Sequence, residues 1–443
     1  MPASLDLPGV PLTLWPLLQA AAGSQRIALV GGAVRDWLLH HQHLDPWRGL
    51  LDLDLVIEDP LAQDQPAAGV RADRSSPAWR LVEHLSSLGH GVSVYEARPH
   101  GQFGTVELEL DLVPTDAASA REVPAAPIRL LLDVASARRE TYPIPADNPV
   151  VHFGALEDDL ARRDFTINAM AVDLATGVLL DPHGGQGDLA ERRLHFLHPN
   201  SLRDDPTRLV RAARYGARLG FMLSEESRGQ AARVLANWPW PWRLGDPPAL
   251  APAALGTRLR GELELLLERE CWILALHQLQ AWGGLLLLDP LLQRDQQWPR
   301  RLSWGRRLGL PLMVALIAPA EDPLALAQRL QLPHRQQVVV RQFLELTGRL
   351  KGTGGPEAAT SPTTAWHWCQ LLEAPGLSPQ AVALALASGL GPRRPLLRWL
   401  LRWRHLGPEL SAHDLMASGV PKGPLLGEQL RRSRQERLER ELL

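Results

Sequence analysis

Two short signatures near the start of the chain combine residue types that could bind a nucleoside triphosphate and a metal ion. Residues 30–36 have the sequence VGGAVRD, and Asp52 and Asp54 follow in an apolar run. A glycine turn between a strand and a helix lets backbone N–H groups approach a phosphate. Alternate strand residues point to one side, so the two carboxylates could hold Mg²⁺. Asp133, on a later predicted strand, is either a third such carboxylate or a surface residue.

Each signature also has a plain structural explanation. Gly31 and Gly32 could form a simple helix-entry turn, with Arg35 on the surface rather than on a phosphate or a ribose. Asp52 and Asp54 could lie on a solvated strand edge. Two aspartates among apolar residues oppose strand propensity, however, and this favours a chemical reason for them. Together the signatures indicate phosphoryl transfer at a metal-dependent site.

A dense polar cluster follows in the segment RRDFTINA, which contains Arg162, Arg163, Asp164 and Asn168. Arginine can clamp phosphates with two parallel hydrogen bonds, and aspartate or asparagine can bind a ribose hydroxyl. The same residues could instead form a capped helix start with flanking charges. The cluster therefore predicts a nucleotide contact with a structural alternative.

A third candidate lies on a predicted helix at residues 206–219. Pro206 suits the first helical position and Asp205 the cap before it. Arg208, Arg211 and Arg214 recur every three residues, a stripe of like charges that repel one another mildly. The stripe could face a nucleotide base, a triphosphate or an RNA backbone. Its alternative is a solvated basic face.

The whole composition sets the limits for these interpretations. The chain has 443 residues, is 45% hydrophobic and carries a formal net charge of −2, which predicts two to four soluble units and a local rather than global basic surface. No apolar run is long enough to predict a membrane span, and the first residues do not resemble a signal peptide. The two cysteines lack metal-like spacing, so we expect a cytoplasmic protein without a zinc site.

The elements that must position these residues alternate between strand and helix in the first part of the chain. Strands are expected at 26–30, 51–57, 92–97, 105–112 and 130–134, and helices at 34–40 and 78–88. Beyond residue 200 the pattern is helical, with one long helix at 255–279 and a charged helix at 429–443. Loops are expected at 59–77 and 114–127, and a linker at 352–362.

The motifs stand in one order, GGAVRD, DLD, RRDFTINAMA, DPHGGQGDL, DDPTRLVRAARYGARLGF and RLRGEL. This order resembles the class II nucleotidyltransferases, which comprise the CCA-adding tRNA nucleotidyltransferases, their CC- or A-adding relatives and bacterial poly(A) polymerases. The resemblance implies an α/β polymerase-beta-like nucleotidyltransferase head at 1–197. An all-α neck at 198–280 that recognises the base would follow, and then a helical body and tail at 281–443 that bind tRNA.

The resemblance also implies roles for the candidate residues. Asp52 and Asp54 match the catalytic carboxylates that bind Mg²⁺, and Gly32 and Arg35 match nucleotide-phosphate contacts. The residues that match ribonucleotide selection are Arg162, Arg163 and Asp164. The residues that match reading of the incoming base, with further contacts in the neck, are Asp205, Arg208, Arg211 and Arg214. Asp204 stands where the family usually has Glu, and its shorter side chain would reach less far toward Arg208.

The expected function is transfer of C, A or both from CTP and ATP to the 3′ end of tRNA. Addition of CC or A alone, poly(A) synthesis, and a non-catalytic RNA-binding role on the same scaffold remain alternatives. The presence of both Asp52 and Asp54 argues against the last. The connection at 41–51 is longer than usual and is expected to be a tolerated surface insertion. The sequence leaves the oligomeric state open.

Overall fold

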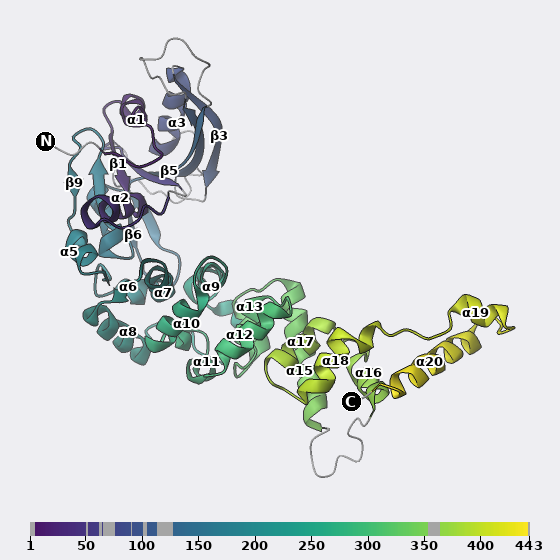
Figure 1. The fold of residues 1–443 in the computed structure, drawn as a ribbon. Coiled ribbons are helices and arrows are strands. Elements are labelled where there is room, and N and C mark those ends of the chain that lie inside the picture. Colours follow the sequence, from purple (N-terminus) through teal and green to yellow (C-terminus); the bar gives the residue numbers. More distant parts are fainter. Residues whose placement is uncertain are drawn as a thin grey trace. The chain divides into compact units, whose positions relative to one another are not determined.

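A computed structural model describes residues 5–49, 52–61, 64, 76–89, 91–100, 104–112, 127–352 and 364–441. The chain divides into two compact units, Met1–Pro241 and Trp242–Leu443 (Figure 1). This boundary falls inside the range predicted as the neck, so the finer division into head, neck, body and tail stays a prediction. No helix in the described residues combines the length and apolar character needed to cross a membrane.

A seven-stranded mixed sheet forms the centre of the first unit, in the order β3-β4-β5-β2-β1-β8-β9. Its strands are β1 (Arg26–Val30), β2 (Leu53–Glu58), β3 (Val92–His100), β4 (Thr105–Leu112), β5 (Ile128–Ser136), β8 (Ala171–Asp173) and β9 (Leu179–Leu180). Strand β2 runs antiparallel to β1 and parallel to β5. Two small sheets pair β6 (Arg138–Thr141) with β7 (Val150–Phe153), and β10 (Arg193–Leu194) with β11 (Met222–Leu223).

The helices of the first unit fill the connections between these strands. They are α1 (Leu14–Ala22), α2 (Gly32–His43), α3 (Pro77–Leu88), α4 (Leu156–Ala161), α5 (Gly185–Ala190), α6 (Ser201–Asp204), α7 (Thr207–Leu219) and α8 (Glu225–Asn237), with a 3₁₀ turn at Thr166–Asn168. Helix α3 begins where Ser76 Oγ accepts the Trp79 N–H, and ends before Gly89, which has a left-handed backbone. This is standard capping chemistry.

The two faces of the large sheet differ in chemistry. On β4 the apolar residues alternate strictly with polar ones and are fully or almost fully buried. Helix α3 packs on β2, β3, β4 and β5, as expected for an amphipathic helix that covers an apolar sheet face. On the opposite face the register aligns Asp54 with Asp133, and Asp133 with Glu107. Cross-strand partners share a face, so three carboxylates form a row across β2, β5 and β4.

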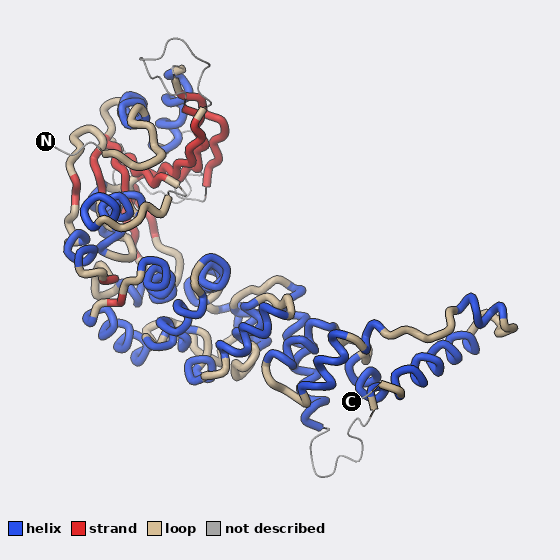
Figure 2. The backbone as a smooth tube through the Cα atoms, in the orientation of Figure 1, coloured by secondary structure: helices blue, strands red, loops and turns tan. Residues whose placement is uncertain are grey.

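The second unit contains only helices joined by loops and turns in its described residues, and every described strand belongs to the first unit (Figure 2). Its α-helices are α9 (Thr257–Arg269), α10 (Trp272–Ala281), α11 (Pro290–Arg294), α12 (Trp298–Arg307), α13 (Leu312–Ile317), α14 (Pro323–Arg329), α15 (His334–Gly352), α16 (Ala365–Leu372), α17 (Pro379–Ala387), α18 (Arg393–Leu401), α19 (Ala412–Ala417) and α20 (Pro424–Glu439). Short 3₁₀ turns lie at Pro248–Leu250, Ala253–Leu255, Gly284–Leu287 and Trp403–His405. Trp298 and Trp403 are among the largest fully buried side chains.

Most expected strands and helices are confirmed with small shifts in their ends, but the long helix at 255–279 is wrong. Helix α9 ends at Arg269 and α10 begins at Trp272, because Glu270 has an extended backbone (φ −113°, ψ 172°). No Gly or Pro marks this break, so periodicity alone could not reveal it. The predicted loops at 59–77 and 114–127, and the linker at 352–362, lie largely outside the described residues.

Candidate active site

The carboxylates Asp52 and Asp54 lie at the start of β2, with Asp133 in register beside Asp54. The strand begins at Leu53 rather than at residue 51, which lies outside the described residues. Burial raises the pKa of Asp54 to about 6, with Arg163 opposing and Asp52 and Asp133 adding to the rise. Burial also raises the pKa of Asp52. A bound cation would offset these costs of charging both carboxylates.

The donor set fits a divalent metal that is completed by a substrate. Mg²⁺ prefers oxygen ligands and is commonly held by one or two carboxylates together with substrate phosphates. Asp52 and Asp54 supply such a pair. Within the described residues, no group of three or more His, Cys, Asp or Glu side chains could hold a metal ion. Asp133 acts on Asp54 through its charge, and its possible role as a third metal ligand stays a prediction.

The glycine turn lies directly against Asp54. Gly31 has a φ of +71°, and a Cβ atom built on it would lie 2.8 Å from Nη1 of Arg163 and 3.1 Å from Oδ2 of Asp54. Only glycine tolerates both this backbone and this crowding. At Gly32 the same construction meets Arg35 at 3.5 Å, an ordinary contact. The turn that opens helix α2, one carboxylate and one guanidinium thus meet at a single point.

Arg35, one turn into α2, is only 4% exposed. It donates to both carboxylate oxygens of Asp36 at 2.8 and 2.9 Å and to Oδ1 of Asn168 at 2.8 Å. Burial disfavours its charge, but Asp36 more than compensates, and the Arg35 pKa lies above its usual value. Its guanidinium also lies 5.3 Å from the ring centroid of Tyr215 on α7. Arg35 therefore joins α2 to the RRDFTINA segment and to α7.

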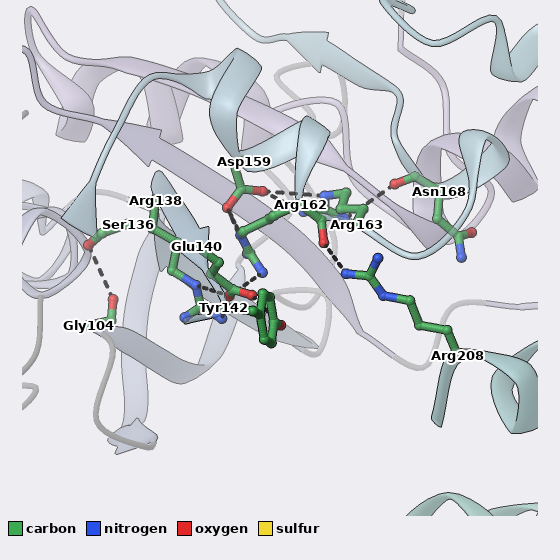
Figure 3. Close-up of polar contacts among 10 residues, drawn as sticks. All are labelled: Gly104, Ser136, Arg138, Glu140, Tyr142, Asp159, Arg162, Arg163, Asn168 and Arg208. Carbon is green, nitrogen blue, oxygen red and sulfur yellow. Dashed lines mark hydrogen bonds and ion pairs between the residues drawn. The ribbon is translucent and has the colours of Figure 1, made fainter. Parts of the chain in front are cut away.

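Arg162 and Arg163 both bind the buried carboxylate of Asp159 (Figure 3). Arg162 donates to Oδ1 at 2.7 and 2.9 Å and reaches Glu140 at 3.1 Å, whereas Arg163 donates to Oδ2 at 3.0 Å. Burial opposes the charge of Asp159, but the two arginines hold its pKa below the usual value. Arg163 also donates to the Asn168 carbonyl oxygen at 3.4 Å. The two arginines are held rigidly from within the protein.

Asp164 connects this segment to α7. Its Oδ1 accepts the Asn168 side-chain amide at 3.0 Å, and its Oδ2 accepts two N–H groups of Arg211 at 2.7 and 2.8 Å. Burial raises the Asp164 pKa, but Arg211 and Asn168 together bring it below its usual value. The alternative of a capped α-helix start is wrong, because the segment makes a 3₁₀ turn and continues into β8.

Arg208 on α7 is 6% exposed and has neutral partners. Its Nη2 donates to the Arg162 carbonyl oxygen at 2.8 Å, and its Nη1 lies 3.5 Å from Nε2 of His198. Burial, and then the charge of Arg208, lowers the His198 pKa to about 4, so His198 is neutral near pH 7 and can accept this bond. Asp204 forms its ion pair with Arg203, at 3.8 Å, and within the described chain it makes no hydrogen bond to Arg208.

The site contains partners that the sequence analysis missed. Asp159, Glu140, Asp36 and His198 hold the arginines but were not singled out. One signal was available for Asp159, because it precedes Arg162 and Arg163 by three and four residues, the spacing of neighbours on a helix. The structure joins the predicted residues Gly31, Arg35, Asp54, Arg162, Arg163, Asp164, Asn168, Arg208 and Arg211 into one contact network.

Three predicted residues stand at the margin of this network. Asp205 caps α7, because its Oδ1 accepts the Thr207 N–H at 3.0 Å and the Thr207 hydroxyl at 2.6 Å. Arg214 lies on α7 three residues beyond Arg211, and Asp52 acts on Asp54 through its charge. The roles of all three in binding a nucleotide or metal stay predictions.

Comparison with known proteins agrees with this arrangement. A family model of the poly A polymerase head domain matches residues 113–195. A CC-adding tRNA nucleotidyltransferase of Deinococcus radiodurans is 33% identical over 398 residues, which cover 85% of this chain and 87% of that protein. An A-adding tRNA nucleotidyltransferase of Aquifex aeolicus is 36% identical over 205 residues, 46% of this chain, but the chain spans only 19% of that longer protein.

Solved structures show the same fold over almost the whole chain. A CCA-adding enzyme of Thermotoga maritima, determined in complex with a tRNA, aligns with a TM-score of 0.61 at 22% sequence identity. The alignment covers 98% of this chain and 92% of that one. The Deinococcus protein is 33% identical to this chain over most of the length of both proteins. The chain therefore belongs to the family of tRNA nucleotidyltransferases that includes CCA-, CC- and A-adding enzymes.

Proposed function

We propose that this chain transfers nucleoside monophosphates from CTP, ATP or both to the 3′ end of tRNA in the cytoplasm, with Mg²⁺ as cofactor and pyrophosphate as product. The observation that carries the proposal is the meeting of the Gly31 turn, Asp54 and Arg163 at one point. A phosphate-binding turn, a metal carboxylate and a cation are the parts that phosphoryl transfer needs together.

The triphosphate binds at the turn that opens α2. The N–H groups at a helix N-terminus and the helix dipole attract an anion, and Gly31 lets the backbone approach it. Arg163 adds a positive charge at the same point, held by Asp159 on its other side. Asp52 and Asp54 would hold Mg²⁺, which would supply charge neutralisation at the phosphates and favour ionisation of the 3′ hydroxyl. The chain's own residues thus orient the α-phosphate next to the two carboxylates.

Base selection is the task of Arg208 in this proposal. Its two hydrogen-bond partners among the described residues, the Arg162 carbonyl and His198, are neutral acceptors. The guanidinium is therefore oriented, but no hydrogen-bonded carboxylate cancels its charge. A fixed guanidinium presents donors in a rigid fork to acceptors on a base edge. Asp205 offers the complementary acceptor beside it. Side chains in this arrangement take the place of a nucleic-acid template.

In this proposal, Arg162, Asp164 and Arg211 position the residues that select the base, because their own charged groups already have partners within the protein. Arg162 pairs with Asp159 and Glu140, and Asp164 accepts hydrogen bonds from Asn168 and Arg211. We infer that Arg162 affects the choice of sugar through its carbonyl bond to Arg208 and not through its own guanidinium. Asp164 keeps acceptor lone pairs that a ribose hydroxyl can use.

The deciding experiment measures incorporation of labelled CTP and ATP, each alone and together, into tRNA that ends at the discriminator base, at C or at CC. Growth to CCA from the bare end means a complete CCA-adding enzyme. Addition of CC alone or of the final A alone means a partial enzyme, and both kinds occur among the relatives. A lack of incorporation on all three acceptors, with extension of an oligo(A) primer, would replace the proposal by poly(A) synthesis.

A further inference from the structure

A pocket of about 480 Å³ opens beside Asp52, on the side of β2 that faces β5. This volume is within the usual range for small-ligand pockets, about 300 to 1,000 Å³. Its lining residues are Pro8, Gly9, Val10, Trp47, Gly49, Asp52, Leu53, Glu109, Arg129, Leu130 and Leu131. None of these except Asp52 has a role in the function proposed above. The pocket is therefore a candidate site next to a reacting group.

The outer walls of the pocket are tied to the rest of the unit. Nε2 of His41 lies 2.9 Å from the Asp6 carbonyl, which joins the end of α2 to the N-terminal segment. The connection that carries Trp47 is anchored by an ion pair of 2.7 Å between Asp45 and Arg192. Most described residues of this connection are exposed, as expected for a surface insertion, and its tolerance to change stays a prediction. Its described part forms the wall of a pocket, held by contacts distant in sequence that no local pattern reveals.

The chemistry of the pocket suits a neutral planar group and not a phosphate. Asp52 and Glu109 contribute two carboxylates, and Oε2 of Glu109 lies 3.9 Å from Nη1 of Arg129. The one guanidinium in the lining, Arg129, donates to both oxygens of Asp111 at 2.8 and 2.9 Å and lies 3.7 Å from the Tyr95 ring centroid. Trp47 lines the pocket, with its ring centroid 5.6 Å from that of His40. An indole can stack on a base, and carboxylates accept the exocyclic amino group of cytosine or adenine. A nucleobase meets all of these demands.

The position of the pocket indicates that it would bind a base of the acceptor RNA and not the base of the incoming nucleotide. The Gly31 turn follows β1, whereas the pocket lies over β5 and β4, and these strands flank β2 on opposite sides. In an in-line displacement the attacking and leaving oxygens lie on opposite sides of the phosphorus. If the triphosphate lies at the Gly31 turn, the attacking 3′ oxygen must arrive from the pocket side.

We infer that this pocket binds the unpaired nucleotide at the 3′ end of the acceptor RNA, with its base stacked on Trp47 and its 3′ hydroxyl directed to Asp52. The inference rests on the proposed function and adds the acceptor subsite to it. Trp47 is then a positioning residue for the RNA, separate from the residues that bind the incoming nucleotide. Its effect falls on the acceptor and spares the affinity for CTP or ATP.

The test is a double-mutant cycle in which two enzyme variants are each combined with two tRNA acceptors. Wild type and Trp47→Ala are assayed with intact tRNA and with tRNA whose terminal nucleotide lacks its base. Loss of one stacked base lowers kcat/KM for tRNA about 5- to 150-fold, and the KM for CTP or ATP stays within about twofold. Trp47→Ala and removal of the terminal base both eliminate the same stacking contact. The two changes together should therefore lower kcat/KM little more than either change alone. Trp47→Phe, which keeps an aromatic face, restores most of the loss.

Trp37→Ala is the matched control, since Trp37 is a partly buried tryptophan of α2 outside the pocket lining. It should leave the KM for tRNA unchanged. Effects of Trp47→Ala and of the abasic end that multiply instead of overlapping would overturn the inference. If wild type transfers no nucleotide to any tRNA, the proposed function fails. The same four combinations, measured as dissociation constants for tRNA, then still decide whether Trp47 holds the terminal base.

Discussion

The turn at Gly31 and the guanidinium of Arg163 interlock. A Cβ atom on Gly31 would come within 2.8 Å of Nη1 of Arg163, closer than real Cβ contacts. Arg163 can move away only by giving up its hydrogen bond to the buried carboxylate of Asp159, which is 3.0 Å long. The positions of the Gly31 turn and of Arg163 are therefore coupled by direct contact, although 131 residues separate them in the sequence.

Gly31→Ala is expected to disable the site while the chain still folds. The substitution adds a Cβ to a residue with positive φ, which costs about 1 to 2 kcal/mol, and it pushes Arg163 away from the turn. We expect kcat to fall at least about tenfold, with a small decrease in Tm. Gly187→Ala on α5 is the control, since a Cβ there meets nothing within 4 Å. Wild-type kcat in Gly31→Ala would contradict the role of the turn.

Asp54→Asn should abolish transfer and leave tRNA binding intact. Removal of one of two metal carboxylates costs several kcal/mol of transition-state stabilisation, or about a thousandfold in kcat. The measurement is single-turnover incorporation together with the dissociation constant for tRNA. Glu107→Gln is the control, because Glu107 lies in the same carboxylate row through its register with Asp133. Comparable losses in both variants would show a general charge effect instead of metal binding.

Local patterns account for the parts of the site that depend on neighbours in sequence. The two-residue spacing of Asp52 and Asp54, the glycine turn before α2 and the arginine stripe of α7 all follow from periodicity and turn chemistry. Asp54 and the arginine stripe lie in the elements expected for them, whereas Asp52 lies one residue before the start of β2. These features were predictable because strand alternation and helix capping act over a few residues.

The partners of the arginines were not predictable in the same way. Arg208 and Arg211 were expected to face a nucleotide or solvent, yet they bind the carbonyl of Arg162 and the carboxylate of Asp164. These contacts join residues 46 and 47 positions apart, and the tertiary fold alone decides them. The wall that contains Trp47 has the same origin, because an ion pair to Arg192 holds its connection.

The buried carboxylate of Asp159 should make stability depend on pH. Its pKa is lower in the folded protein than in the unfolded chain, so its contribution is present above the unfolded value, near 4, and is lost as the pH falls through the folded pKa. Asp159→Asn removes the buried carboxylate that Arg162 and Arg163 share, and it should cost about 3 to 5 kcal/mol near neutral pH. The measurement is urea unfolding of both proteins from pH 7 to pH 3. The difference in the free energy of unfolding between wild type and Asp159→Asn should decrease only below about pH 4.

A matched surface substitution separates this effect from general acid destabilisation. Glu96→Gln removes an exposed partner of Arg98, and ion pairs between exposed side chains contribute little to stability. Its unfolding midpoint should follow that of wild type over the same pH range. If the gap between Asp159→Asn and wild type widened on acidification, the sign of the pKa shift at Asp159 would be wrong.

Arg208→Ala should blur the choice of nucleotide more than it slows transfer. In the proposal, the Arg208 guanidinium donates hydrogen bonds to acceptors on the edge of the base. One such contact contributes about 1 to 3 kcal/mol to discrimination between bases, so its loss should lower selectivity about 5- to 150-fold. The measurement is the ratio of kcat/KM for CTP or ATP to that for UTP and GTP. His198→Ala removes only one of the two acceptors that orient Arg208, so its loss of selectivity should be smaller. Arg203→Ala, an exposed neighbour on α6, should change neither ratio. If Arg208→Ala remained as selective as wild type, another group would have to read the base.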